Sequence, residues 1–272
     1  AQTTIVIDMF LFNKEVGASK VQQQDLTQQL TDALINKKIF HSNIEIKFIT
    51  DPINSVYGGI LPNNYRQLRQ GGIDVIETDL TPLRASNPVW SGLWYICCQG
   101  LGNTTESGWL PNPFGDEKIT LRSYFNLFNF KANHRKTITV DTKDGWKTLV
   151  TSMNPHDGSS RHSNVALVVD GNTAIDVLKT EQTVVMMSKG DVSGVVIGDF
   201  DGDKNLPQVQ VLTEKAILDA TLKTIESAKK NENIDLAMFY LSERQIVKAL
   251  IADLRKEGGS VFFSTHALEV AE

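Results

Sequence analysis

The side chains with the clearest chemical potential are His134 and Lys136, which stand two positions apart and are followed by Asp141. Alternate residues of an extended strand point to the same side, so this imidazole and this ammonium would share one face. An imidazole can attack phosphorus, and an ammonium can hold the non-bridging oxygens whose charge must be stabilised in the transition state. The pattern therefore predicts chemistry on a phosphodiester.

The sequence around this pair predicts the strand that it requires. Residues 137 to 140 read Thr-Ile-Thr-Val and are all β-branched, which is typical of strands. The residues from 141 to 145, Asp-Thr-Lys-Asp-Gly, are turn formers that would end the strand.

Upstream of the motif, strand and helix patterns alternate. Apolar runs rich in β-branched residues predict strands, and leucines and isoleucines at helical spacing predict the helices between them. In chain order we expect strand 3–12, helix 24–37, strand 44–50, helix 64–70 and strand 73–76. This order predicts an α/β fold, in which a sheet flanked by helices is extended by the motif strand. Ligands of such folds usually bind at strand ends.

The rest of the chain predicts further elements and the beginning of a second unit. We expect strands at 166–170, 183–187 and 195–197, a helix at 213–230, a strand at 234–241 and a helix at 242–256. The apolar strand at 234–241 is similar to the opening strand, as if a new α/β unit began there. The predicted organisation is a complete half at 1–175, followed by connecting strands and the start of a second, incomplete half at 176–272.

The H-x-K-x4-D motif of His134 to Asp141, followed by Ser152-Met153-Asn154, resembles the phospholipase D superfamily, including its cardiolipin-synthase-like members. That resemblance implies a mixed sheet flanked by helices. It implies a phosphodiesterase or phosphatidyltransferase that works through a phosphohistidine intermediate, without a metal or another cofactor. It also implies a site shared by two similar halves, each of which donates one motif.

The resemblance implies roles for individual residues. His134 would be the nucleophile, Lys136 would bind the phosphoryl oxygens, and Asp141 would hold the local structure of the motif or orient a neighbour. Polar contacts on the phosphate side would come from Ser152, Asn154 and Ser160. The residues from 154 to 160 also fit an ordinary turn.

The chain departs from the family pattern in two places. It contains one motif, so a second copy would come from a homodimer mate or from further sequence of a longer protein; the apparent second unit favours the longer protein. The family glutamate that helps to orient the imidazole is replaced by Ala166. Asp141 and Asp157 are the candidates for that orienting role.

Residues 82 to 123 lose periodicity and are rich in Trp, Gly, Asn and Pro. Such a segment can be a substrate-covering loop or a surface loop anchored by its aromatics, and the segment from Trp90 to Ile96 could instead dip into a lipid interface. Cys97 and Cys98 are adjacent, and we expect them not to bridge each other.

Two weaker patterns lie towards the C-terminal end. The acidic run at 199–205 departs from a calcium-binding loop, which needs a Gly at its sixth position and a Glu at its twelfth, so a solvated turn is predicted. Residues 254–272 resemble the switch-histidine strand of ATP-binding-cassette ATPases. The sequence has no phosphate-binding G-x-x-x-x-G-K-[ST] motif for such a function, so we expect either a fortuitous similarity or a foreign end.

Charge and composition favour a phospholipid substrate. The formal net charge is −5, which argues against nucleic-acid binding through bulk positive charge, and the aromatic segment suits an amphiphile. No run of 18 apolar residues predicts a membrane span, although peripheral membrane contact is compatible with the sequence. The alternatives are a single-motif dimeric nuclease and a catalytically inactive half that serves as a binding module.

Overall fold

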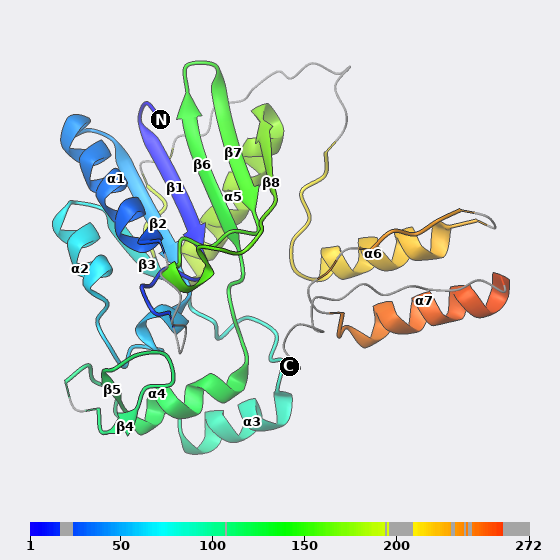
Figure 1. The fold of residues 1–272 in the computed structure, drawn as a ribbon, viewed down its shortest axis with the longest axis horizontal. Coiled ribbons are helices and arrows are strands. Elements are labelled where there is room, and N and C mark those ends of the chain that lie inside the picture. The colour runs from blue at the N-terminus through cyan, green and yellow to red at the C-terminus, as the bar shows by residue number, and fades with distance from the viewer. Residues whose placement is uncertain are drawn as a thin grey trace. The chain divides into compact units, whose positions relative to one another are not determined.

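The computed structural model describes residues 1–16, 24–106, 108–193, 195, 209–229, 232–236, 238 and 241–257 (Figure 1). The chain divides into two compact units, residues 1–209 and 210–272. The expected boundary between residues 175 and 176 falls inside helix α5 (Gly171–Met187), which packs on the sheet of the first unit. Helix α5 therefore belongs to the first unit.

The first unit is built on a six-stranded mixed sheet, which confirms the predicted α/β class. The strand order is β3-β2-β1-β6-β7-β8. The parallel part consists of β1 (Thr4–Met9), β2 (Glu45–Thr50) and β3 (Asp74–Glu77). The antiparallel part consists of β6 (Lys136–Thr142), β7 (Gly145–Thr151) and β8 (Ala166–Asp170). The motif strand extends the sheet as predicted, and β7 is an additional strand.

Strand β1 lies at the centre of the sheet, and all six of its residues are buried. Its odd-numbered residues, such as Ile7, pack in a core with Leu34 of α1 (Leu26–Phe40) and Leu68 of α2 (Asn63–Gln70). Val6, which points to the opposite face, packs with Leu178 of α5. Figure 1 shows these helices on either side of the sheet. Burial on both faces explains why β1 is a continuous apolar run.

The segment from residue 82 to 123 contains more regular structure than expected. It forms α3 (Pro88–Cys97), β4 (Leu110–Pro111), β5 (Lys118–Ile119) and α4 (Leu121–Asn126), which lie beyond the lower end of the sheet in Figure 1. The side chain of Asn87 caps α3 by accepting from the backbone N–H of Trp90 at 3.4 Å, and Pro88 occupies the first turn.

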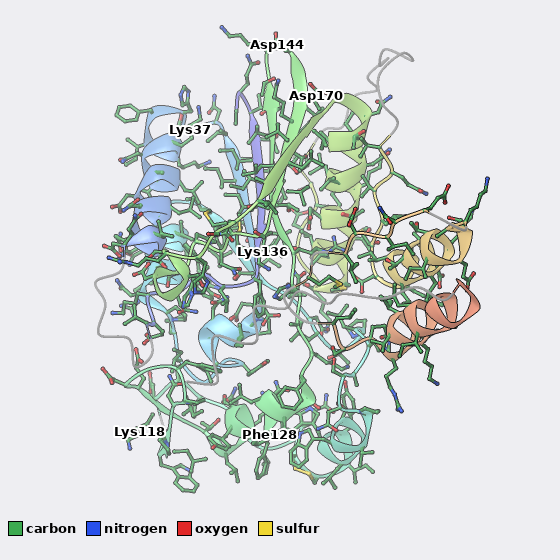
Figure 2. All side chains as sticks on the ribbon, turned by 45° about the vertical axis from the view of Figure 1, so that its right-hand side comes forward. Lys37, Lys118, Phe128, Lys136, Asp144 and Asp170 are labelled. Atoms are coloured by element: carbon green, nitrogen blue, oxygen red, sulfur yellow. A yellow bond between two sulfur atoms is a disulfide. The ribbon has the colours of Figure 1, made fainter. Side chains whose placement is uncertain are left out.

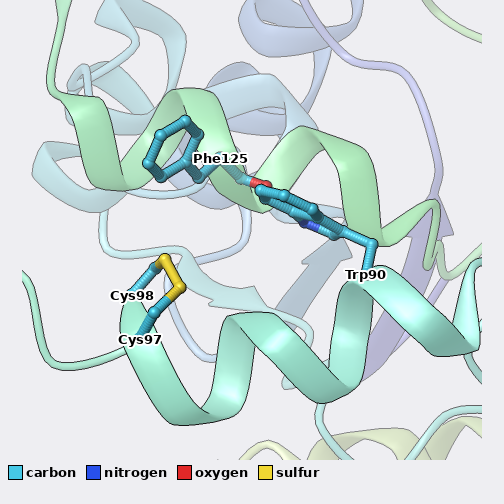
Figure 3. Close-up of a disulfide and its surroundings, with 4 residues drawn as sticks. All are labelled: Trp90, Cys97, Cys98 and Phe125. Carbon is cyan, nitrogen blue, oxygen red and sulfur yellow. A yellow bond between two sulfur atoms is a disulfide. The ribbon is translucent and has the colours of Figure 1, made fainter.

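Cys97 and Cys98 form a disulfide at the C-terminal end of α3, so the expectation that they do not bridge each other was wrong (Figure 3). Adjacency alone holds their Cα atoms 3.7 Å apart, which keeps the sulfurs within reach. The bond closes so short a loop that it constrains the unfolded chain very little.

Three short 3-10 helices complete the described parts of the first unit, at Pro52–Ser55, Leu127–Asn129 and Asp157–Ser159. The strand predicted at 183–187 was wrong, because these residues form the last turns of α5. The β-branched Val184 and Val185 favour a strand by propensity, but both are buried against the sheet as part of a helix.

The second unit contains helices α6 (Lys215–Ser227) and α7 (Arg244–Glu257), both predicted. They share a small core of Ile225, Ile246 and Leu250. The described residues between 234 and 241 form no strand, in contrast to the prediction. Residues 196 and 197, the acidic run at 199–205 and the tail from 258 onwards lie outside the described residues.

The core of the first unit predicts a large difference between two phenylalanines. Phe48 is fully buried, whereas Phe40 is 79% exposed. We expect Phe48→Ala to lower the free energy of unfolding by about 3–5 kcal/mol, and Phe40→Ala to change it by less than about 0.5 kcal/mol. Urea denaturation measures both variants, and equal effects would contradict the described packing.

Candidate active site

The polar residues of the candidate site lie at the end of the sheet where the parallel strands have their C-terminal residues, and we call this end the ligand edge. Because β6 runs antiparallel to β1, Lys136 at the start of β6 lies opposite Met9 at the end of β1. The C-terminal ends of β2 and β3 reach the same edge. Figure 2 labels Lys136 at this lower end of the sheet and Asp144 at the opposite end. The motif therefore begins where α/β folds usually bind ligands.

The predicted pair of His134 and Lys136 is brought together at this edge. The Lys136 Nζ atom lies 3.2 Å from Nδ1 of His134 and donates to the His134 carbonyl oxygen at 3.0 Å. The ring of Phe10 packs at 4.4 Å from the imidazole, and the Lys136 ammonium lies 5.2 Å from the centre of the same ring. His134 is exposed and Lys136 is buried, so a ligand at this edge meets the imidazole first.

Burial sets the protonation of both groups. Burial lowers the pKa of Lys136 to about 8, although the Asp8 carboxyl opposes this shift. His134 is exposed only in part, so partial burial of the ring, and then the charge of Lys136, lowers its pKa, and the imidazole is neutral at neutral pH. A protonated Lys136 can donate only to an unprotonated Nδ1, and that contact places the imidazole proton on Nε2.

Asp141 lies at the other end of β6, five residues from Lys136 and therefore about 17 Å away along the strand. Its carboxylate accepts from the backbone N–H groups of Gln2, Thr3 and Thr4 at 2.8–3.0 Å. Burial disfavours its charge, but the hydrogen bonds from Thr4, Thr3 and Gln2 outweigh burial and lower the pKa of Asp141. Asp141 thus fixes the start of β1 and does not touch His134.

Ser152 and Asn154 hold loops at the ligand edge. The Ser152 Oγ atom accepts from the Val165 N–H and contacts Asn164 Oδ1, both at 3.0 Å. The Asn154 Oδ1 atom accepts from the Leu11 N–H at 3.1 Å. Asn154 therefore ties the β7–β8 connection to the loop after β1, beside Phe10.

Ser160 and Asp157 hold the start of α1. The Ser160 Oγ atom accepts from the Gln24 N–H at 3.0 Å, and Asp157 accepts from the Thr27 N–H at 2.9 Å. Neither of the two candidates for orienting the imidazole, Asp141 and Asp157, has that function in the described contacts. Ala166 is the first residue of β8.

Sequence reasoning missed two buried acids behind the motif. Asp8 of β1 is fully buried, and Glu181 of α5 is 1% exposed. The side-chain amide of Asn133 donates to both Asp8 oxygens at 2.8 and 2.9 Å. Thr137 donates to Glu181 at 2.9 Å. The signal in the sequence was a lone aspartate within the apolar run Thr-Ile-Val-Ile-Asp-Met, where burial of a charge is costly.

Two cavities adjoin the motif. The larger, about 770 Å³, is lined in part by Phe10, Asn54, Arg66, Phe114, His156 and His162. The smaller, about 280 Å³, is lined in part by Thr78, Trp94, Tyr95, Arg122 and Lys131. Phe10 contacts His134, and Thr78 accepts from Asn133 at 3.0 Å. The larger cavity is therefore the one that adjoins the side of the motif carrying His134.

Within the described ranges, no cluster of three His, Cys, Asp or Glu residues is arranged to hold a metal ion. In the same ranges, the helices are too short or too polar to cross a bilayer.

The chain has limited similarity to known proteins. No protein-family model matches the sequence, and no curated protein matches it. Among solved structures, the chain is similar to Nuc from Salmonella typhimurium, a member of the phospholipase D family. The two chains are 13% identical, with 69% of this chain and 80% of Nuc covered at a TM-score of 0.37. The chemistry of the site must be judged from its own residues.

The position of Asp141 predicts a structural effect with a defined pH dependence. We expect Asp141→Asn to lower the free energy of unfolding by about 1 kcal/mol at neutral pH. The folded-state pKa of Asp141 is lowered, so its stabilisation is present above the unfolded value near 4 and is lost as pH falls through the folded value.

Urea denaturation at several pH values checks this prediction, with Asp144→Asn in the neighbouring turn as the control. The wild-type chain and Asp141→Asn should converge in acid. A constant difference between them at every pH would show that the charge of Asp141 is not the cause.

Proposed function

We propose that this chain carries one half of a phospholipase D-like phosphodiesterase site, with His134 as the nucleophile. The observation that supports this most strongly is the His134–Lys136 pair, 3.2 Å apart at the ligand edge of the sheet. His134 is exposed to an incoming phosphodiester, and Lys136 lies close enough to hold its oxygens.

The reaction would proceed in two displacements. His134 Nε2 attacks phosphorus and the first alcohol leaves with a proton from a general acid; water or a second alcohol then attacks the phosphohistidine and releases His134. Lys136 stabilises the charge that develops on the phosphoryl oxygens, and the Asn154 amide, at the same edge, assists. Hydrolysis and phosphatidyl transfer differ only in the second attacking group.

Before His134 Nε2 can attack phosphorus, the imidazole proton must move from Nε2 to Nδ1. In the described contacts Lys136 faces Nδ1, which leaves the proton on the attacking Nε2 atom. When Lys136 turns to a bound phosphoryl oxygen, Nδ1 becomes free to carry the proton. Since Ala166 replaces the orienting glutamate, this chain relies on substrate binding for that change.

A second copy of the motif must supply the general acid. The contacts of the described residues bring no second histidine to His134. Strand β8 is an edge strand, and Leu167 and Val168 on it are 57% and 64% exposed. An exposed apolar edge strand is normally covered by another part of a protein, which fits a dimer mate or a second half.

A phospholipid is the substrate class that the surface favours. Helix α3 carries no charged residue, and its Val89, Leu93 and Ile96 are 85%, 51% and 88% exposed at helical spacing. Such a face suits contact with a membrane surface, whereas nucleic acid requires a basic one. The inner side of α3 lines the smaller cavity through Trp94 and Tyr95.

An inactive binding module is the second candidate. It is favoured by the replacement of the orienting glutamate by Ala166 together with the occupied Nδ1 of His134. Such a module would bind a phosphodiester through Lys136 without cleaving it.

Turnover by the purified chain tests the proposal. We expect release of choline from a phosphatidylcholine analogue, or conversion of phosphatidylglycerol vesicles, in fractions whose mass shows two copies of the chain. His134→Asn should abolish turnover, and His162→Asn, a histidine of the larger cavity, should retain most of it. Loss of activity only in the His162 variant would refute the assignment of the nucleophile. Binding of the vesicles without turnover by a dimer would support the module instead.

The pKa of Lys136 predicts the alkaline limb of the pH profile. Because that pKa is lowered to about 8, the free enzyme loses its cation as pH rises past this value, and kcat/KM should fall there. Lys136→Arg should move the fall to higher pH, since guanidinium stays charged. A wild-type profile that stays flat to about pH 10 would mean that the Lys136 charge is not required.

A further inference from the structure

The two buried acids lie against alternate residues of the motif. Asn133, Arg135 and Thr137 contact Asp8 or Glu181, while the residues between them, His134 and Lys136, contact each other and Phe10. This alternation is that of an extended chain, and the Phe10 N–H donates to the Arg135 carbonyl at 3.0 Å as a continuation of the sheet. One side of the motif is thus held by acids, and the other side faces the ligand edge.

The two acids lie among charged groups of the motif segment. Asp8 interacts electrostatically with Glu181 from α5 and with Arg135 and Lys136 from the motif segment. Arg135 lies 3.4 Å from Glu181. Asp51 from the loop after β2 also accepts from the backbone of Asn133 at 2.6 Å. Two neighbouring buried carboxyl groups favour holding one proton between them, because each charge is costly to bury and repels the other.

Asp8 is the member of the pair that holds the proton. Burial, and then the negative charge of Glu181, raises the pKa of Asp8 well above its ordinary value. Arg135 and Thr137 both donate hydrogen bonds to the Glu181 carboxyl group.

We infer that Asp8 and Glu181 share a single proton and act together as a positioning unit, which fixes Asn133, Arg135 and Thr137 so that His134 and Lys136 face the substrate. The role of this unit in turnover rests on the proposed function. The shared proton and the contacts that fix the motif do not depend on the proposed function, because both are properties of the folded chain without substrate.

Infrared difference spectroscopy of the full chain at neutral pH tests the shared proton. The wild-type chain should show the C=O band of the shared proton beside a band from Asp51, whose pKa burial raises to about 7. Asp8→Asn, which keeps the shape of the side chain, should lose the band of the shared proton. Glu181→Gln should shift that band, because burial still raises the pKa of Asp8 while the neighbouring carboxyl group is gone. Asp176→Asn, an exposed acid on the same helix, should keep it unshifted. Absence of the band in the wild type, or its unshifted persistence in both buried variants, would overturn the inference.

The ring signals of His134 in an NMR spectrum test the positioning role without substrate. They are assigned by their loss in His134→Asn. We expect Asp8→Asn and Glu181→Gln to shift these signals and to change the titration of the ring, while Asp176→Asn leaves both unchanged. Unaltered His134 signals in the two buried variants would overturn the positioning role. If either Asp8→Asn or Glu181→Gln fails to fold, as judged by circular dichroism, the test is made with the variant that folds.

Kinetics then separate this inference from the proposed function. If the wild-type chain turns over a phosphodiester, kcat should fall on the order of 100-fold in Glu181→Gln with KM little changed, because a misplaced nucleophile costs rate rather than binding. A larger KM with an unchanged kcat would contradict a positioning role. No turnover by the wild type would count against the proposed function alone, since the infrared and NMR results stand without it.

Discussion

The antiparallel pairing of β1 with β6 is the constraint on which the candidate site depends. Its register places Lys136 opposite Met9, so the motif begins at the same edge as the C-terminal ends of the parallel strands. A shift by one residue would turn His134 and Lys136 towards α5 and their neighbours towards the ligand. At the far end of the same strand, Asp141 fixes this register by accepting from the first residues of the chain.

The same pairing explains why charged groups are buried at the centre of the sheet. Asp8 belongs to the face of β1 that packs on α5, where its neighbour two positions earlier is the apolar Val6. An isolated carboxylate there would be strongly destabilising, but Asn133 and Glu181 supply polar partners from the motif and from the helix. The core and the site are therefore one structure, in which burial on one side of the motif determines what is exposed on the other.

Most of the elements that position the site could be predicted from the sequence. The β-branched runs and the spacing of the leucines gave β1, α1, β2, α2, β3 and β6 within a few residues. The pairing of His134 with Lys136 followed from the alternation of an extended chain. These features are local, and each is determined by residues that are near one another in the sequence.

The features that could not be predicted depend on distant contacts. Val184 and Val185 favour a strand by propensity, but packing on the sheet makes them part of α5. Glu181 gave no local signal, because its partners Arg135 and Thr137 lie more than forty residues away. By contrast, the start of α3 was readable in Asn87-Pro88, an N-cap followed by a first-turn proline, which the many aromatic residues obscured.

A covalent adduct on His134 would test the central claim most directly. A nitrophenyl phosphodiester suits the measurement, since its leaving group departs without a proton and a half-site can react with it. After incubation and quenching in base, in which phosphohistidine survives, mass spectrometry of peptides should locate the phosphoryl group on His134. An adduct on another histidine, or release of nitrophenol with His134 unmodified throughout the reaction, would contradict the account.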